Sequence, residues 1–346
     1  MKQRAALSYR SAGVDIDAMQ QALARVRRLA RSASRPEVLG DAGGFGGLFR
    51  LSRGRLRDPV LVASVDGVGT KLRVALEAGI HDTVGEDLVA HCVNDILVQG
   101  AEPLFFMDYL ATGSIKPRVV VEVVSGIARA CRKFGLALLG GETAEMPGFY
   151  TGGDYDLAGF IVGVVERRRL LERSKVRPGD RLVGLASNGL HTNGYSLARK
   201  ILFERLGLGL RSRVGGMRRT VAQVLLRPHR CYLRAVRPLL RAGSIHSMAH
   251  ITGGGLTDNL PRALPRGCAA RVRTGAWRMP PIFRVLQQGG SVGDAEMRRT
   301  FNLGVGMVLV VPAGRLKAVL RALGRGGERA FDIGEIVRGR TKVIYE

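Results

Sequence analysis

The sequence predicts an α/β fold of the α+β type, divided into two domains near residue 166. The chain has 346 residues, and a single hydrophobic core usually stops growing at roughly 250–300 residues. Strand patterns alternate with helical periodicity through the first half, which is typical of α/β architecture. The alternation then breaks into charged residues and a Pro-Gly turn between Glu166 and Asp180. We therefore expect an N-terminal domain over 1–166 and a C-terminal domain over 167–346.

The first half contains three helical patterns and four strand patterns. Apolar residues recur at helical spacing through Ile16, Met19 and Leu23, and Pro117 suits the first turn of a helix, where its missing amide is not needed. Runs of valine and other β-forming residues indicate strands. In chain order, we expect a helix at 14–33, a strand at 60–65, helices at 85–99 and 117–134 on either side of a strand at 104–110, and strands at 136–139 and 156–166.

The second half continues with shorter elements. We expect a strand at 181–186, helices at 195–206 and 229–241, a strand at 246–251 and a terminal pair of strands around 331–345. Polar or Gly-rich loops follow two of these strands, at 187–194 and 252–256. Ligands of open α/β sheets bind at the carboxyl ends of strands, so these loops are candidate binding segments.

The strongest compositional feature is an excess of basic residues. Lys and Arg number 54 against 29 Asp and Glu, which gives a net charge of +25. A basic surface attracts polyanions such as nucleic acid. However, the basic residues are spread along the chain, and the single Trp leaves few rings for base stacking. A solvated basic surface is the simpler interpretation, and an RNA-associated role is the alternative from a different class.

Other features predict a soluble, cytoplasmic protein with no membrane partner and no specific nucleic-acid partner. The basic N-terminus is not followed by an apolar segment, and no apolar run approaches the roughly 18 residues of a membrane span. The four cysteines are widely spaced and form no Cys-x-x-Cys pair. We therefore expect reduced thiols rather than a zinc site or a redox pair.

Three acidic residues near element ends are candidates for binding a magnesium nucleotide. Asp66 follows a predicted strand and opens Asp66-Gly-Val-Gly-Thr-Lys71, Asp95 lies in a predicted helix, and Glu142 follows two glycines. Carboxylates suit Mg²⁺, and Gly-rich turns present backbone amides to phosphate. Taken singly, a plain turn explains the first segment equally well, and the polar face of a half-buried helix explains Asp95. Taken together, the three acids favour a magnesium–nucleotide site.

His191 is distinguished from the other histidines by its surroundings. It lies between Gly189 and Asn193, in a polar loop after a predicted strand, and it is one of six histidines in the chain. A lone histidine is more often structural than catalytic, but functional groups concentrate in loops at strand ends. No Ser-His-Asp or Cys-His arrangement stands out. That pattern favours chemistry in which the protein positions substrates and stabilises charge, as in phosphoryl transfer.

A series of motif segments follows in order along the chain. The segments are Ser8–Asp17, Gly43–Gly46, Asp66–Leu72, Cys92–Asp95, Gln99–Phe106, Gly140–Gly148, Tyr155–Gly159, His191–Leu197, His250–Gly255 and Arg299–Met307. Together they resemble motifs of the aminoimidazole ribonucleotide synthetase family, and the resemblance runs nearly from end to end without large insertions.

The resemblance implies a fold and a reaction. It implies an N-terminal ATP-binding domain whose sheet pairs with that of a second copy to close a β-barrel across a homodimer, and a C-terminal mixed-sheet domain with flanking helices. The implied enzyme is a ligase of purine biosynthesis that uses ATP and Mg²⁺. It converts formylglycinamidine ribonucleotide to 5-aminoimidazole ribonucleotide, with release of ADP and phosphate. The γ-phosphoryl group would activate the formyl oxygen, and the amidine nitrogen would then close the ring.

The resemblance also implies roles for individual residues. The metal ligands would be Asp66, Asp95 and Glu142. The catalytic set would be Lys71, which neutralises phosphoryl charge, together with Asp95, His191 and Asn193. Glycines of the C-terminal domain would face the substrate, namely Gly253, Gly254 and Gly255. The nucleotide and its phosphates would be held by Gly43, Gly44, Phe45, Gly46, Asp66, Gly67, Gly69, Thr70, Lys71, Gly141 and Glu142.

Two positions depart from the family pattern, and other family relatives give the alternative functions. His229 stands where the family usually has threonine, and Asp258 stands where glutamate is common. The alternatives are other ATP-using relatives, such as selenophosphate synthetase or thiamine-monophosphate kinase. A selenophosphate synthetase would carry a reactive cysteine near its N-terminus, whereas the first cysteine here is Cys92. A hydrogenase-maturation relative would end in cysteine, whereas this chain ends in Glu346.

Overall fold

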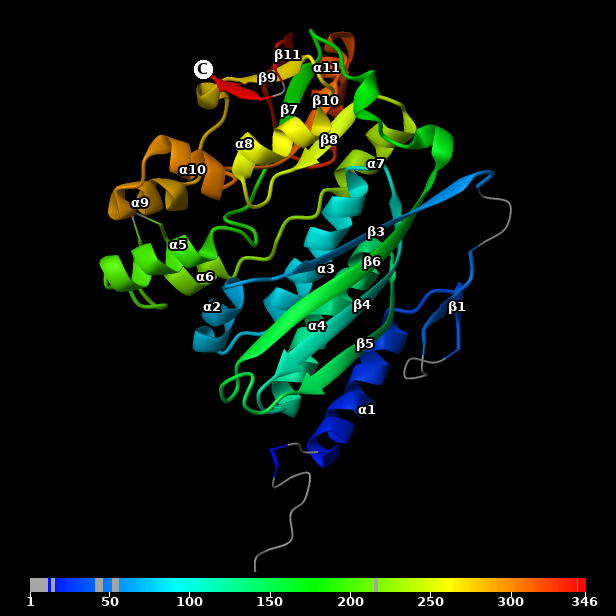
Figure 1. Ribbon diagram of the computed structural model, residues 1–346, viewed down its shortest axis with the longest axis vertical. Helices are drawn as coiled ribbons and strands as arrows, with labels where there is room; N and C mark the ends of the chain where they lie inside the picture. The colour runs from blue at the N-terminus through cyan, green and yellow to red at the C-terminus, as the bar shows by residue number, and fades with distance from the viewer. Residues whose placement is uncertain (1–11, 14–15, 41–45, 52–55, 215–216, 341) are drawn as a thin grey trace, which may run out of the picture.

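The computed structural model describes residues 12–13, 16–40, 46–51, 56–214, 217–340 and 342–346. Within them, a four-stranded sheet and a six-stranded sheet form the centres of two domains (Figure 1). The N-terminal domain contains α1 (Ile16–Ser32), β1 (Val38–Leu39), β2 (Leu48–Phe49), β3 (Pro59–Gly67), α2 (Lys71–Ala78), α3 (Asp82–Leu97), β4 (Glu102–Thr112), α4 (Pro117–Phe134), β5 (Ala137–Glu145) and β6 (Tyr155–Glu166).

The C-terminal domain is built from shorter elements. Its strands are β7 (Arg181–Ala186), β8 (Ser247–His250), β9 (Cys268–Val272), β10 (Val305–Val311), β11 (Ala330–Arg338) and β12 (Val343–Tyr345). Its helices are α5 (Tyr195–Arg199), which continues as the π-helical segment η3 (Lys200–Arg205), α6 (Val221–Leu225), α7 (Leu233–Arg241), α8 (Gly255–Asn259), η4 (Leu260–Ala263), α9 (Pro281–Gly290), α10 (Asp294–Thr300) and α11 (Leu316–Arg325).

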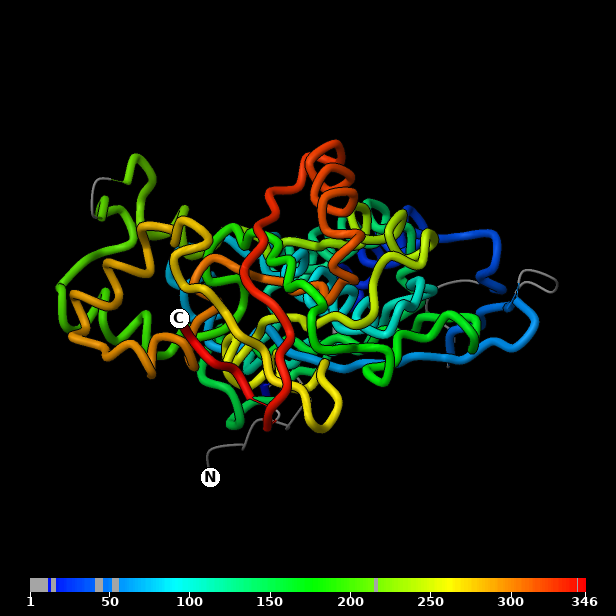
Figure 2. Tube along the Cα trace, turned by 90° about the horizontal axis from the view of Figure 1, so that it is seen from above, coloured from blue at the N-terminus to red at the C-terminus, as the bar shows by residue number. Residues whose placement is uncertain are grey.

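The N-terminal sheet has the order β3-β6-β4-β5, in which only the β4–β5 pair is parallel. Side chains alternate between its two faces, as the strand period of two requires. In β3, Val60, Val62 and Asp66 are partly buried, whereas Leu61 and Val65 on the other face are exposed. The helices cover one face only. Figure 2 accordingly shows α1 on the side of the molecule opposite to β3.

Helices α3 and α4 form the layer behind this sheet, and two glycines let them approach closely. A Cβ on Gly85 of α3 would lie 2.2 Å from the carbonyl oxygen of Val123, and one on Gly126 of α4 would lie 1.9 Å from that of Asp82. Helix α4 begins at Pro117 and ends at Gly135, whose φ of 77° suits glycine. Close backbone contact at this crossing fixes the position of α3.

The C-terminal sheet has the order β12-β9-β11-β7-β10-β8, antiparallel except for the β12–β9 pair. Both of its faces are covered, so every residue of β10 is buried. Val183 and Leu185 of β7 join a core that includes α7 and α11, whereas Leu182 joins a second core with α8. The mixed sheet with flanking helices confirms the predicted two-domain α/β fold.

Helix α3 connects the two domains through side chains that bond to the loop before α7. Asn94 donates to the carbonyl oxygen of Arg230 at 2.8 Å and accepts from the amide of Tyr232 at 3.0 Å. The amide of His229 donates to Asp87 at 2.6 Å. Because these side chains satisfy the backbone, residues 229–232 stay outside the helix, and α7 begins at Leu233 rather than at 229, where the sequence pattern placed its start.

One further boundary differs from the expectation. The pattern ended a strand at residue 139, but β5 runs on to Glu145 because it pairs with β4 as far as Thr112. Gly141 and Glu142 therefore lie inside a strand and not in a loop after it. Among the described helices, none combines the length and the apolar composition that crossing a membrane requires.

Candidate active site

Four histidines from separate parts of the chain converge where the two domains meet. His91 lies on α3, His191 follows β7, His229 precedes α7, and His250 ends β8. The ring of His91 is 5.2 Å from that of His229 and 5.1 Å from that of His250, centroid to centroid. His191 stacks on His229 at 4.1 Å. All four side chains are buried.

Two carboxylates border this histidine cluster. Asp66 lies near the end of β3, and Asp95 lies one helical turn after His91, so both α3 side chains are on one helix face. Asp66 Oδ2 is 2.7 Å from His91 Nε2, and Asp95 Oδ1 is 2.8 Å from His250 Nδ1. The side chains of Asp66 and Asp95 remain 40% and 25% exposed. A ligand entering between the domains can therefore reach both acids.

Burial and mutual contact set the charges of these groups. Burial disfavours a charged His91, but the hydrogen bond to Asp66 and the charge of Asp95 raise its pKa above the usual value. Burial alone would raise the pKa of Asp66, yet the hydrogen bond and charge of His91 lower it. For His250, burial lowers the pKa despite the bond to Asp95. These shifts favour the charged forms of His91 and Asp66 and the neutral form of His250.

His229 and Thr192 complete a hydrogen-bonded chain between the two acids. His229 Nε2 lies 3.1 Å from His250 Nε2, and His229 Nδ1 lies 3.3 Å from Thr192 Oγ1. Thr192 Oγ1 is in turn 2.7 Å from His91 Nδ1. Burial holds the pKa of His229 well below its usual value. The neutral ring therefore has one N–H to donate and one nitrogen to accept.

His191 is a neutral, backbone-strained residue of this cluster. Its φ is 64°, a left-handed value that is uncommon outside glycine. Burial, with the charges of His250 and Lys71, holds its pKa well below the usual value. Among the described residues, its Nδ1 has no hydrogen-bond partner. A Cβ on Gly306 would lie 2.5 Å from Cε1 of His191, so glycine at 306 leaves room for the ring.

Lys71 is placed differently from what a phosphate-binding lysine would require. Its side chain is fully buried, and Nζ lies 2.8 Å from Asp87. The ammonium also donates to the carbonyl oxygens of His191 at 3.1 Å and of Arg227 at 2.9 Å. These three acceptors use all of its donors. In this conformation Lys71 holds the loop of His191, and its role toward phosphate stays a prediction.

The predicted substrate residues lie partly at the junction. A Cβ on Gly253 would be 3.2 Å from Asn193 Oδ1, so these two residues are brought together. A Cβ on Gly254 would be 2.7 Å from that of Asp258. A Cβ on Gly255 would be 2.0 Å from the carbonyl oxygen of Arg298, so packing against α10 requires glycine there.

The predicted phosphate-binding residues are placed only in part. Gly43, Gly44 and Phe45 lie outside the described residues. Gly46 is described and would have open space around a Cβ. Asp66 and Gly67 are the last two residues of β3. Gly69, with a φ of 67°, and Thr70 lie in the turn that follows, and Thr70 Oγ1 contacts Ser196 Oγ of the C-terminal domain at 3.0 Å.

Glu142 is separated from the other two acids. The pairing register places Asp66 opposite Gly159, Gly159 opposite Asp108, and Asp108 opposite Gly141. Three strand spacings of about 4.8 Å therefore separate β3 from β5, roughly 14 Å in all. Because side chains alternate along a strand, Glu142 also lies on the opposite face of the sheet from Gly141. Within one chain the structure brings Asp66 and Asp95 together but not Glu142, whose metal role stays a prediction.

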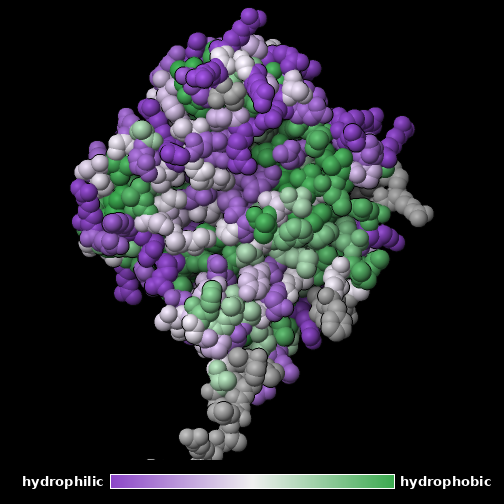
Figure 3. All heavy atoms as spheres, viewed as in Figure 1, coloured by the Kyte–Doolittle hydropathy of each residue, from purple (hydrophilic) through white to green (hydrophobic). Residues whose placement is uncertain are grey.

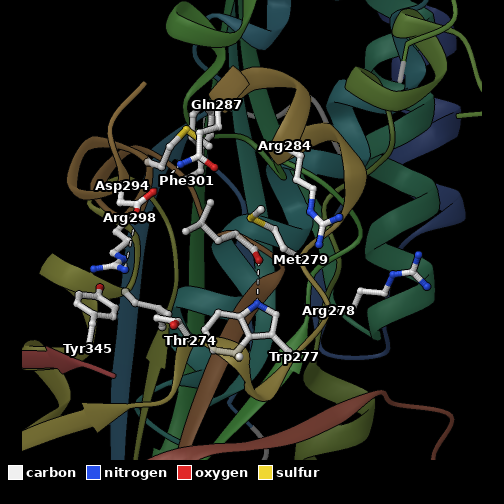
Figure 4. A pocket seen from close by; sticks show the side chains of 14 residues that line it. Thr274, Trp277, Arg278, Met279, Arg284, Gln287, Asp294, Arg298, Phe301 and Tyr345 are labelled. Carbon is white, nitrogen blue, oxygen red and sulfur yellow. Dashed lines mark hydrogen bonds and ion pairs between the residues drawn. The ribbon is translucent and has the colours of Figure 1, made fainter. Parts of the chain in front are cut away.

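A pocket of about 410 Å³ opens in the C-terminal domain, and residues of α8, α9 and α10 contribute to its lining (Figure 4). Trp277 and Tyr345 line it, and the indole donates to the carbonyl oxygen of Leu303 at 2.9 Å. The guanidinium of Arg298 lies 4.5 Å from the centre of the Tyr345 ring. Asp258, one of the two departures from the family pattern, pairs with Arg299 at 3.0 Å. None of the four histidines lines this pocket.

Sequence reasoning missed several residues of the cluster. His250 lay inside a motif segment and His91 directly before one, but neither was assigned a role. His229 was noted only as a departure from the family pattern. The i,i+4 spacing of His91 and Asp95 was a readable signal, because such residues share a helix face. Asp87 carried no comparable signal, since its partner Lys71 is sixteen positions away and on another helix.

The fold and this site define a two-domain α/β protein with a histidine–carboxylate cluster between the domains. Two family models match the chain: "AIR synthase related protein, N-terminal domain" over residues 50–165 and "AIR synthase related protein, C-terminal domain" over 177–346. The chain therefore belongs to the AIR synthase related protein family.

Curated relatives are similar along nearly the whole chain. The chain is 53% identical to the phosphoribosylformylglycinamidine cyclo-ligase of Citrifermentans bemidjiense over 332 residues, 96% of this chain and 95% of that protein. The enzymes of the same name from Geobacter metallireducens and Sorangium cellulosum are 55% and 54% identical, each over 96% of this chain and 95% of their own.

Solved structures share the fold at low sequence identity. Thiamine-monophosphate kinase from Stenotrophomonas maltophilia superimposes with a TM-score of 0.66 at 20% identity, covering 94% of this chain and 96% of that chain. The hydrogenase maturation protein HypE, in complex with ATP, gives a TM-score of 0.64 at 18% identity, covering 92% and 88%. These likenesses concern the fold alone.

Proposed function

We propose that this chain is a phosphoribosylformylglycinamidine cyclo-ligase of purine biosynthesis. The observation that carries the proposal is the similarity to cyclo-ligases of 53–55% identity over 96% of the chain. The substrate is formylglycinamidine ribonucleotide, and ATP is the co-substrate. The products are 5-aminoimidazole ribonucleotide, ADP and phosphate. We place this biosynthetic ligase in the cytoplasm.

The reaction requires activation of a weak electrophile. The formyl amide oxygen attacks the γ-phosphorus of ATP, the bond between that phosphorus and the β,γ-bridging oxygen breaks, and ADP leaves. The amidine nitrogen then attacks the formyl carbon, the nitrogen loses a proton, and the C–O bond breaks to release phosphate. Holding the nucleophile beside the carbon supplies several kcal/mol of the rate gain, about 7 or more in well-oriented cases.

The residues of the junction suit this chemistry. Neutral His191 and the amide of Asn193 can hydrogen-bond the formyl group without competing for the phosphoryl charge. The ammonium of Lys71 holds the loop of His191 through its hydrogen bond to the carbonyl oxygen of His191. Gly253, next to Asn193, leaves the C-terminal backbone open to the substrate.

Mg²⁺ fits the acid pair that borders the histidine cluster. Asp66 and Asp95 are both partly exposed, and each has a carboxylate oxygen within 4 Å of the same His91 nitrogen. Mg²⁺ is usually bound through one or two carboxylates plus substrate phosphates and water, which is the donor set available here. When bound, the ion would neutralise charge on the nucleotide phosphates.

The outer face of the N-terminal sheet supports a homodimer in which two such sheets close a barrel. Figure 3 shows an apolar patch over this face. Leu61 and Val65 of β3 are 57% and 68% exposed, and Phe160 of β6 is 41% exposed on the same face. Contiguous exposed apolar surface of this kind marks protein interfaces. The dimerisation domain covers 1–166, and the C-terminal domain covers 167–346.

The test is a stopped assay with the purified full chain, formylglycinamidine ribonucleotide, ATP and Mg²⁺. Aminoimidazole ribonucleotide is followed through its diazotisable amine, and ADP is counted in parallel. We expect product only when ATP is present, with one ADP for each product. A folded, dimeric protein that forms no product would overturn the proposal, and thiamine monophosphate would then be tried as the phosphoryl acceptor.

A further inference from the structure

Three potential metal-ligand atoms meet in the histidine cluster. His91 and His250 each offer a ring nitrogen and Asp95 offers a carboxylate oxygen, all within 4.8 Å of one another. His250 Nδ1 is 2.8 Å from Asp95 Oδ1, and His91 Nε2 is 3.7 Å from Asp95 Oδ2. Donors around a tetrahedral ion with bonds near 2.0 Å lie roughly 3.3 Å apart. Small side-chain shifts therefore bring the three atoms to coordination distance.

The second nitrogen of each histidine is already held by a buried partner. His91 Nδ1 is 2.7 Å from Thr192 Oγ1, and His250 Nε2 is 3.1 Å from His229 Nε2. Metal-binding histidines almost always engage their other nitrogen in this way, because it fixes the ring and makes the ligand more basic. Both rings can therefore keep this second hydrogen bond while their other nitrogen binds an ion.

Asp66 supplies a fourth donor and the route of entry. Its Oδ2 lies 2.7 Å from His91 Nε2, and its side chain is 40% exposed. The complete donor set is then two imidazoles and two carboxylates, drawn from both domains. Imidazole suits Zn²⁺ and its neighbours in the first transition series, whereas Mg²⁺ prefers oxygen donors alone.

We infer that His91, Asp95 and His250, with Asp66, form a binding site for a divalent transition-metal ion of the zinc class. The inference deepens the proposed function, because it names the metal ion that Asp66 and Asp95 bind when the nucleotide is absent. It rests on the proposed function only for the role of this site in catalysis. The bound ion joins β3 and α3 of one domain to β8 of the other.

The test uses the full chain without an affinity tag, dialysed against EDTA and then titrated with Co²⁺ in the absence of ATP and substrate. Tetrahedral Co²⁺ with nitrogen ligands has visible absorption bands. We expect bands that saturate at one equivalent and disappear when Zn²⁺ is added. The thermal midpoint of the metal-free protein is also expected to rise on addition of Zn²⁺, since a ligand of the folded state stabilises it.

Variants separate this site from surface histidines. His91→Gln and His250→Gln are expected to weaken Co²⁺ binding by at least about 100-fold, because each removes a ligand. The matched control is His246→Gln, since His246 Nδ1 also pairs with an aspartate, Asp180, at 2.8 Å, but outside the cluster. Thr192→Val keeps every ligand and removes only the support of His91, so a loss of about 10–100-fold is expected.

The outcomes distinguish this inference from the proposed function. Absence of Co²⁺ bands at one equivalent, or bands that persist undiminished in both ligand variants, would overturn the metal site. Cyclisation with Mg²⁺ alone would still stand in that case. Conversely, a protein that binds Co²⁺ through these residues but forms no aminoimidazole ribonucleotide would keep the metal site and lose the cyclo-ligase.

Discussion

At the scale of single residues, Asp95 links the two domains while part of it stays accessible. One of its oxygens bonds His250 of the C-terminal domain, and the other accepts from Ser64 of β3 at 3.4 Å. A quarter of the side chain remains exposed. Asp95 can therefore hold a cation while it connects the two domains.

Replacing Asp95 with alanine tests this role directly. We expect Asp95→Ala to lower turnover by about 100-fold or more, a loss typical of removing one group that stabilises transition-state charge. The far-ultraviolet circular dichroism should stay unchanged. Asp58→Ala is the control, because the side chain of Asp58 is 62% exposed and its ion pair with Arg167 is long, at 3.9 Å. Near-normal turnover of Asp95→Ala would remove it from the catalytic set.

Lys71 leads to a prediction about stability. Its ammonium and Asp87 are both fully buried, so removing one partner leaves the other charge without compensation. We expect Lys71→Met to lower the free energy of unfolding by about 3–5 kcal/mol, measured by urea denaturation at fixed protein concentration. Adding Asp87→Leu should restore much of that loss. If the double variant is as unstable as the sum of the two single ones, the pair is not coupled.

The sequence predicted some residues of the site but not their mutual contacts. Asp66, Asp95 and His191 were predicted, and the first two do lie beside the same histidine. Lys71 was expected to face phosphate because it ends a Gly-rich turn, yet it points inward to Asp87. Burial of a lysine against a carboxylate on another helix depends on how the helices pack, which a local pattern does not contain.

At the scale of elements, the crossing of α3 and α4 fixes the position of the site. The two helices touch through Gly85 and Gly126, where a side chain would meet backbone oxygen at 2.2 Å or less. Backbone cannot move aside as a flexible side chain does. The crossing thus places His91 and Asp95 at the junction of the two domains.

An added methyl group at this crossing is expected to destabilise the fold. Gly126→Ala should lower the free energy of unfolding by about 1–3 kcal/mol, since overpacking forces the helices apart. The control is Gly324→Ala in α11, which has open space around a Cβ and should stabilise the helix by about 0.5–1 kcal/mol. Denaturant midpoints check both expectations: the midpoint of Gly126→Ala should lie below that of the wild type, and the midpoint of Gly324→Ala above it. Equal effects would exclude steric overlap as the cause.

Elements with strong local signals were predicted well, and the misses had tertiary causes. The predicted helix at 117–134 has the bounds of α4, because proline and glycine mark its two ends. The strand predicted at 181–186 is β7. In contrast, β5 exceeds its predicted length because β4 pairs with it. The start of α7 moved to Leu233 because Asp87 and Asn94 bond the preceding backbone.

At the scale of the whole molecule, none of the described helices covers one face of the N-terminal sheet, and Phe49 and Leu56 pack against only part of it. Its helices all lie on the other side (Figures 1 and 2), and Leu61, Val65 and Phe160 are exposed on this face. A second copy would bury these side chains and stabilise both chains. The proposed barrel across a homodimer accounts for this surface.

Charged substitutions on this face test the dimer. We expect Leu61→Lys combined with Val65→Lys to convert a dimer to a monomer in size-exclusion chromatography with light scattering, because two pairs of lysines would be buried together. Leu206→Lys is the control, since Leu206 is 39% exposed but belongs to the C-terminal domain. A double variant that remains dimeric would place the interface elsewhere, and a monomeric wild-type protein would contradict the dimer itself.

The most direct test of the proposed chemistry follows the oxygen of the formyl group. Formylglycinamidine ribonucleotide labelled with oxygen-18 at its formyl carbonyl is converted with ATP, and the released phosphate is analysed by mass spectrometry. Activation of that oxygen by the γ-phosphoryl group predicts one labelled oxygen in each phosphate, in step with aminoimidazole ribonucleotide. Unlabelled phosphate, or ATP hydrolysis without ring closure, would contradict phosphoryl transfer to the formyl oxygen at this site.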